Sequence, residues 1–122
     1  MAGAVAKMLL KKLAPELNIV GFATEIGAEK LSTGDKQKFL IEASSKTDAQ
    51  DQYTARFPSA DHLKIKTLLE KTQAEGNSVG GSVEVRVFGM PRGLGQPVFH
   101  KLKADLAAAM MSVGATHSFS IG

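Results

Sequence analysis

Residues 81–106, GSVEVRVFGMPRGLGQPVFHKLKADL, carry the strongest fold signal in the chain. Val83, Val85 and Val87 alternate with small or charged residues, which predicts a strand with one apolar face and one polar face. This alternation is typical of an antiparallel sheet, where one face packs on the core and the other meets water. A turn rich in glycine and proline follows, and the apolar spacing then becomes helical. The stretch therefore predicts a strand, a turn and a helix in succession.

The helix after this turn is expected to begin at Pro97, because a proline at the first helical position loses no hydrogen bond. Its predicted apolar stripe consists of Phe99, Leu102, Leu106, Ala109, Met110 and Val113. Residues 116–121, THSFSI, alternate weakly and are interpreted as a final strand.

Working toward the N-terminus, residues 59–75 have helical spacing, with Ser59 as the expected cap and Gly76 as the expected left-handed terminator. Residues 17–26, LNIVGFATEI, are rich in β-branched and aromatic types and predict a strand. Residues 2–13 have apolar residues at three-and-four spacing, which predicts a helix with one buried face.

Residues 28–58 are mostly polar apart from a short apolar run at 39–41. We expect a short helix after Gly34 and then a long exposed loop, as in a surface excursion from a domain. Taken together, these segments predict an α+β fold in which helices pack on an antiparallel sheet, with residues 1–122 forming a single domain.

The composition bounds the class of protein. The 122 residues include 43% hydrophobic residues, enough for one domain with a core, and the formal net charge is only +3. The absence of cysteine excludes disulfides and thiolate metal sites and favours a reducing, cytoplasmic location. No apolar run approaches the roughly 20 residues that a membrane span needs, and the lysines near the N-terminus do not precede an apolar run as in a secretory signal.

Several motifs are candidates for chemical sites. Gly93-Leu94-Gly95 fits neither the dinucleotide nor the P-loop spacing, so a turn is favoured over a phosphate nest. His62, His100 and His117 share no ligand spacing, so no metal site is predicted, and His62 and His100 are expected to be solvated. Asp105, at the edge of the helical stripe, could be a general base, but a structural ion pair or cap is favoured.

A basic surface is the remaining candidate, formed by Lys7, Lys11, Lys12, Arg86 and Arg92. No aromatic residue is interleaved with these residues to stack on bases, so a solvated face is favoured over nucleic-acid binding.

Three segments together resemble chorismate synthase, the flavin-dependent lyase that ends the shikimate pathway. They are MAGAVAKMLL at residues 1–10, the long run EGNSVGGSVEVRVFGMPRGLGQPVFHKLKADLAAAMMSVGA at 75–115, and SFSIG at 118–122. The resemblance covers about residues 1–27 and 56–122, with no clear match between them. Asp105 and the Met111-Ser112 pair follow the family pattern. Family carboxylates are replaced at Asn77, Gln96, His100 and Lys103.

The resemblance implies a sandwich of helices between two antiparallel sheets, of which this chain would supply part. It implies an enzyme that converts 5-enolpyruvylshikimate 3-phosphate to chorismate and phosphate with reduced FMN, without net redox change. The matched segments correspond to the middle third of that enzyme, so its active-site histidines and substrate-binding arginines are expected outside this chain. The chain alone is therefore expected to be inactive, with no catalytic residue of its own and weak or no flavin binding.

Within the chain, the resemblance assigns flavin contact to the loop at Gly114 and Ala115. Ala115 keeps the family residue, whereas Gly114 departs from it, so only a backbone contact would survive at that position.

A non-catalytic scaffold or self-association domain derived from the family is the alternative hypothesis, and a nucleic-acid binder ranks last. If the rest of the enzyme is missing, an apolar face is uncovered, so a homo-oligomer with helices at the contact is expected. A small-molecule substrate is expected only for the intact enzyme, and no membrane or nucleic-acid partner is expected.

Overall fold

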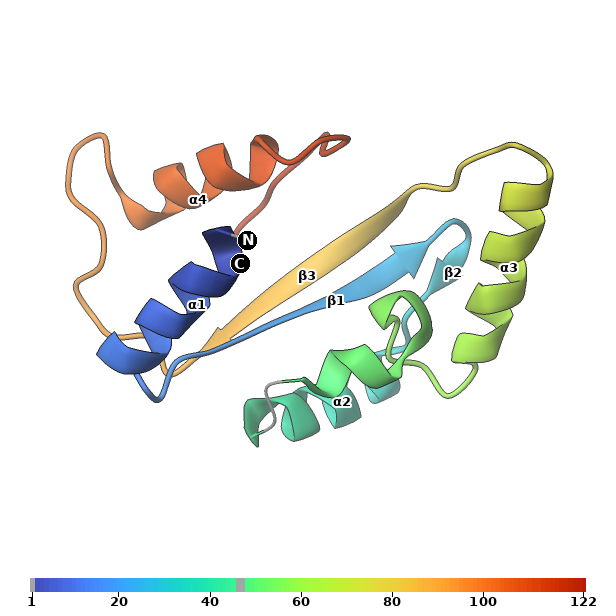
Figure 1. Ribbon diagram of the computed structural model, residues 1–122, viewed down its shortest axis with the longest axis horizontal. Coiled ribbons are helices and arrows are strands. Elements are labelled where there is room, and N and C mark those ends of the chain that lie inside the picture. The colour runs from blue at the N-terminus through green and yellow to red at the C-terminus, as the bar shows by residue number, and fades with distance from the viewer. Residues whose placement is uncertain (1, 46–47) are drawn as a thin grey trace. The chain divides into compact units, whose positions relative to one another are not determined.

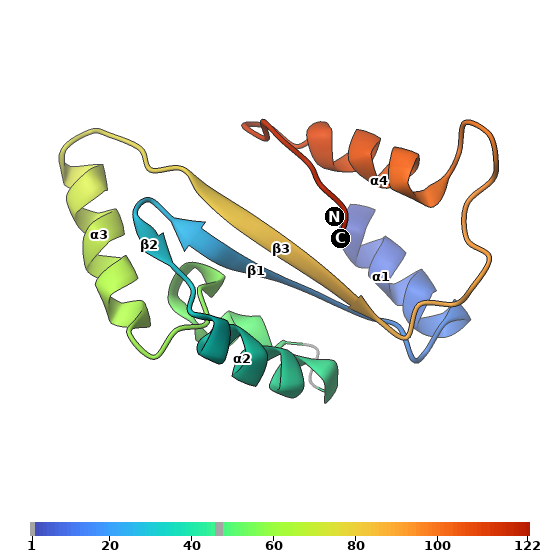
Figure 2. The same ribbon diagram turned by 180° about the vertical axis from the view of Figure 1, so that it is seen from behind.

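The computed structural model describes residues 2–45 and 48–122 and divides into two compact units, Met1–Met90 and Pro91–Gly122. The first unit contains three helices, a three-stranded antiparallel sheet and two 3-10 turns (Figures 1 and 2). In chain order these are α1 (Ala2–Leu13), β1 (Asn18–Ile26), β2 (Glu29–Lys30), α2 (Thr33–Ser45), η1 (Ala49–Gln52), η2 (Thr54–Arg56), α3 (His62–Ala74) and β3 (Gly81–Phe88). The second unit contains α4 (Leu102–Met111). The fold class is α+β, as predicted.

The sheet has the order β2-β1-β3, so β1 is central and β3 forms one edge (Figure 1). The pairing of β1 with β3 places Ile19 opposite Val87 and Gly21 opposite Val85. A register shift between Ala23 and Glu25 interrupts this pairing, which is the mark of a bulge in β1. The predicted strands at 17–26 and 83–87 are therefore confirmed, and the structure pairs them as neighbours although they lie far apart in the sequence.

The core of the first unit consists of two clusters of buried side chains, and β1 contributes residues to both. Val20 and Phe22 pack with Phe39, Ala43 and Ala49, and the rings of Phe22 and Phe39 meet edge to face at 4.9 Å. A second cluster consists of Ala23, Ile26, Phe57 and Ile65.

The prediction of a long exposed loop within residues 28–58 is wrong for the described part of that segment. α2 runs to Ser45, and Phe39, Ala43, Ala49 and Phe57 are buried. The polar composition hid this contribution because two of these four core residues are alanines, which carry little weight in an apolar pattern. Residues 46 and 47 of the predicted loop lie outside the described residues.

The valine row of β3 is also exposed rather than buried within this unit. Val83, Val85 and Val87 keep 72%, 41% and 36% of their surface, although their alternation with polar residues is as predicted. The opposite face of β3 is the covered one, where Phe88 packs on the first core cluster and Glu84 binds Lys36 of α2. Alternation therefore identified the strand but not the face that its own unit covers.

α1 has the predicted bounds, yet its apolar stripe, which includes Val5, Leu9 and Leu13, is exposed. Among the described helices, none is long and apolar enough to cross a membrane.

α3 begins two residues later than predicted, with Asp61 rather than Ser59 at the N-cap position. Its C-terminal end is as predicted. Gly76 has φ of +64°, its N–H donates to the carbonyl of Gln73, and the N–H of Asn77 donates to the carbonyl of Thr72, both at 3.0 Å. This pair of bonds is a Schellman motif, and the left-handed conformation at its centre favours glycine.

In the second unit, α4 begins at Leu102 and not at Pro97. The N–H of Gln96 donates to the carbonyl of His100 at 2.6 Å, which closes a turn over the residues between them. Phe99 consequently lies before the helix with 85% of its surface exposed, so it is not part of the helical stripe.

The predicted final strand at 116–121 is absent, since the described residues contain no strand that pairs with it. An extended segment becomes a strand only when a neighbour satisfies its backbone groups.

Candidate functional site

The predicted flavin contact, Gly114 and Ala115, lies in a turn directly after α4. The N–H of Val113 donates to the carbonyl of Met110 at 3.1 Å, and the N–H of Thr116 donates to that of Val113 at 3.3 Å, so the chain turns twice within a few residues. Ala115 has φ of +62°, a conformation that non-glycine residues seldom adopt. Such backbone outliers often occur where a protein contacts a ligand.

This turn does not form a flavin site by itself. Both residues are exposed, and a Cβ added at Gly114 would meet nothing within 4 Å. Cofactor sites are concave and bury most of the ligand, whereas a single exposed turn covers one side at most. The residues present therefore do not fit an enclosed FMN, and no chemical step can be assigned to them.

Gly93 and Gly95, the candidate phosphate nest, lie in the turn before α4 with φ of +83° and +90°. A Cβ on Gly95 would come within 2.6 Å of the backbone nitrogen of Leu102. The glycine is needed because the loop packs closely against the start of the helix. The segment is a turn, as predicted from the sequence.

Asp105 has the structural role that the sequence favoured, and its partner is a histidine. Its Oδ1 lies 3.3 Å from Nδ1 of His100, and both side chains are exposed. The pair links the turn before α4 to the first turn of the helix. An exposed pair of this kind lacks the enclosed surroundings that a general base uses.

His62 is not solvated as predicted but half-buried at the start of α3. The N–H of Thr54 donates to its Nδ1 at 3.4 Å, and its ring meets the ring of Tyr53 edge to face at 5.8 Å. Tyr53 in turn meets Phe39, so His62 ends a row of aromatic rings that begins in the core. His117 is exposed. Across residues 2–45 and 48–122, no group of three His, Asp or Glu side chains could hold a metal ion.

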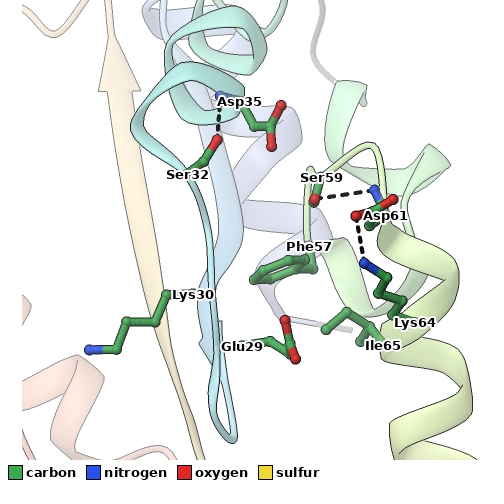
Figure 3. A pocket seen from close by; sticks show the side chains of 9 residues that line it. All are labelled: Glu29, Lys30, Ser32, Asp35, Phe57, Ser59, Asp61, Lys64 and Ile65. Atoms are coloured by element: carbon green, nitrogen blue, oxygen red, sulfur yellow. Dashed lines mark hydrogen bonds and ion pairs between the residues drawn. The ribbon is translucent and has the colours of Figure 1, made fainter.

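A cavity of about 220 Å³ lies where the segment from β2 to α2 meets the start of α3 (Figure 3). It is lined by Glu29, Lys30, Ser32, Asp35, Phe57, Ser59, Asp61, Lys64 and Ile65. No pattern in the sequence predicted this cavity, although Ser32, three residues before Asp35, is a helix-start signal for the segment that forms one wall.

Several polar groups around this cavity bind one another within the protein. Ser32 Oγ accepts from the N–H of Asp35 at 3.1 Å, and Ser59 Oγ accepts from that of Asp61 at 3.3 Å (Figure 3). Lys64 Nζ donates to Asp61 Oδ2 at 2.8 Å, and this hydrogen bond and the opposite charge lower the pKa of Asp61 and raise that of Lys64. These contacts begin two helices and do not converge on a ligand.

The candidate basic surface consists of Lys7, Lys11 and Lys12 on α1, Arg86 on β3 and Arg92 in the second unit. Arg86 binds Glu84 on its own strand, so its charge is partly neutralised there.

The predicted site residues thus lie in a folded core region or in an exposed turn. Comparison with known proteins identifies the family of the chain. The chorismate synthase family model matches residues 1–122. The match includes residues 28–55, where the sequence analysis found no resemblance, so that boundary was wrong.

The chain is 43% identical over 122 residues to the chorismate synthase of Bdellovibrio bacteriovorus, covering all of this chain and 34% of that protein. It is 38% identical to the chorismate synthase of Methylacidiphilum infernorum, covering 98% of the chain and 31% of the relative. It is 41% identical to that of Methanosarcina mazei, with the same two coverages. The chain spans about a third of the length of these relatives. On the strength of a match along its whole length, the chain belongs to the chorismate synthase family.

Proposed function

We propose that this chain forms part of a chorismate synthase, which eliminates phosphate and a ring proton from 5-enolpyruvylshikimate 3-phosphate to give chorismate, with reduced FMN. The observation that carries this proposal is the family match over all 122 residues, combined with coverage of about a third of each relative. A cytoplasmic location, expected from the absence of cysteine, belongs to the same proposal.

In this proposal the chain supplies scaffold rather than catalytic groups. The β1–β3 pair and the core beneath it form a folded support, and α4 leads into the turn at Gly114 and Ala115. That turn would provide a backbone contact to the flavin once other parts of the enzyme enclose the cofactor. The groups that protonate, deprotonate and bind phosphate would come from the rest of the enzyme.

A chimera tests the proposal. The matched segment of the Bdellovibrio bacteriovorus protein is replaced by these 122 residues, and chorismate formation is measured with reduced FMN. We expect the chimera to be active and the isolated chain to give no product above a buffer control. Turnover by the isolated chain would contradict the assignment of catalytic groups to other segments.

A non-catalytic scaffold or self-association domain is the second candidate. It is favoured by the exposed valine row of β3 and by the loss of family carboxylates at Asn77, Gln96, His100 and Lys103. A chimera that folds with the circular dichroism of the parent protein but makes no chorismate would favour this candidate over the enzyme.

A further inference from the structure

The loop that joins α3 to β3 contains one of the two asparagines of the chain, Asn77, directly before Ser78. The backbone N–H of Ser78 donates to Oδ1 of Asn77 at 2.8 Å. Because Oδ1 is bonded to Cγ, this contact places the nitrogen of Ser78 beside the electrophilic carbon of the asparagine side chain. The two residues are adjacent in the sequence, so the contact is local to the loop and does not depend on other parts of the protein.

The surroundings of this pair leave room for a reaction between the two groups. Asn77 and Ser78 are both exposed, and residues 77–80 form neither helix nor strand. A Cβ added at Gly76 or at Gly80 would meet no atom within 4 Å, so the loop has open space on both sides of the pair. The serine side chain is also small, and it hinders the approach of its own nitrogen less than a β-branched side chain would.

The other asparagine of the chain lies in a contrasting environment. Asn18 begins β1 and is half-buried, and its Nδ2 donates to the carbonyl of Ala43 at 2.7 Å. The residue after it is the β-branched Ile19, which is paired with Val87 of β3. The strand pairing and the bond to α2 hold this side-chain amide in place, so it is not free to approach the next backbone nitrogen. Asn18 is therefore an internal control for Asn77.

We propose that Asn77-Ser78 is a site of spontaneous deamidation, at which Asn77 is converted to aspartate or isoaspartate. The nitrogen of Ser78 loses its proton to solvent base and bonds to Cγ of Asn77, the Cγ–Nδ2 bond breaks, and Nδ2 leaves as ammonia with a proton from water. One water molecule then opens the succinimide ring. Cleavage of the new Cγ–N bond gives aspartate, and cleavage of the backbone C–N bond gives isoaspartate. The net reaction consumes water and releases ammonia, with no oxidant or reductant.

The modification changes the charge and the backbone of the loop between α3 and β3. The aspartate product carries a carboxylate at the position where this chain replaces a family carboxylate with Asn77. The isoaspartate product instead lengthens the backbone of the loop by one methylene group. Both products add a negative charge. The proposal concerns a modification of the chain and goes beyond the proposed function.

Peptide mass spectrometry tests the proposal on the folded chain. Trypsin cleaves after lysine and arginine, so it releases Asn77 within residues 72–86 and Asn18 within residues 13–30. After incubation at mildly alkaline pH, we expect the 72–86 peptide to gain the mass difference between a hydroxyl and an amino group and to separate into two chromatographic forms. Fragment ions should place the change at Asn77 and not at Gln73. Its rate should exceed that of Asn18 by roughly tenfold or more.

Two variants at the next residue test the role of the Ser78 nitrogen. Ser78→Gly removes the remaining side chain beside this nitrogen and should speed the conversion of Asn77. Ser78→Val adds a β-branched side chain there and should slow the conversion. Far-UV circular dichroism confirms that both variants are folded.

The same incubation in urea separates the folded loop from the unfolded chain. Asn77 should react in the folded chain at a rate close to its rate in urea, because the loop leaves the pair accessible. Asn18 should react measurably only in urea, where the strand pairing and the bond to Ala43 are lost.

Three results would overturn the proposal. The first is an equal rate for Asn77 and Asn18 in the folded chain. The second is a conversion of Asn77 that occurs in urea but not in the folded chain, which would mean that the loop protects the asparagine. The third is a rate at Asn77 that neither substitution of Ser78 changes.

Discussion

Lys36 Nζ lies 2.6 Å from Glu84 Oε2 and so links α2 to β3 across 48 residues of sequence. The two side chains keep only 30% and 25% of their surface. Partial burial raises the pKa of Glu84, but the hydrogen bonds and charges of Lys36 and Arg86 outweigh it and hold this pKa below the ordinary value of 4.5. The ionised carboxylate is therefore the form that the folded protein favours.

Glu84→Gln should lower the free energy of unfolding by about 1 kcal/mol at pH 7. Because the pKa of Glu84 is lower in the folded state, its contribution is complete above the ordinary carboxyl pKa and is lost as the pH falls through the folded value. The difference between the two proteins should therefore shrink below about pH 4.5. Urea unfolding at a series of pH values measures it. Glu70→Gln, which removes an exposed pair 3.9 Å from Lys66, is the control and should change the free energy of unfolding by less than about 0.5 kcal/mol at pH 7.

Phe39→Ala should destabilise the protein by about 3–5 kcal/mol, because it removes a buried ring between Phe22 and Tyr53. Ile41→Ala, on the exposed side of the same helix, should change the unfolding free energy by less than about 0.5 kcal/mol. Urea unfolding of the two variants measures both values. Equal midpoints would mean that α2 does not pack on the sheet and that residues 28–58 are an exposed excursion after all.

Gly76→Ala should cost about 1 kcal/mol, since its φ of +64° is a left-handed conformation that alanine adopts with strain. No atom lies within 4 Å of the added Cβ, so the cost is conformational and not steric. Gly80→Ala is a matched control, because it is equally open and does not have a positive φ. Thermal unfolding should show a lower melting temperature for Gly76→Ala alone, and an equal loss in both variants would argue against the Schellman motif.

Flavin binding to the isolated chain should be weak, with no saturation at micromolar FMN. The exposed turn at Gly114 and Ala115 leaves most of a flavin surface in water. Titration followed by flavin fluorescence measures this, and the active chimera should bind FMN far more tightly under the same conditions. Stoichiometric binding by the chain alone would show that the turn is part of a complete site.

The sequence alone determined the features that depend on neighbouring residues. Alternating valines identified β3, apolar spacing and Pro15 identified α1, and Gly76 identified the end of α3, because strand period, helix period and left-handed caps are local properties of the backbone. The long run of family-like residues from 75 to 115 likewise indicated the family, to which the match over residues 1–122 assigns the chain.

The tertiary structure decided which faces are covered and which segments supply the core. Ala43 and Ala49 became core residues because α2 and η1 pack on Val20 and Phe22, and no local pattern marks an alanine for burial. The valines of β3 remained exposed within their unit because α2 binds the other face through Lys36 and Glu84. Residues 116–121 have strand-like alternation but form no strand, since a strand requires the hydrogen bonds of a neighbour that sequence period cannot supply. Local conformation follows from short-range sterics, whereas burial and pairing depend on partners that are distant in the sequence.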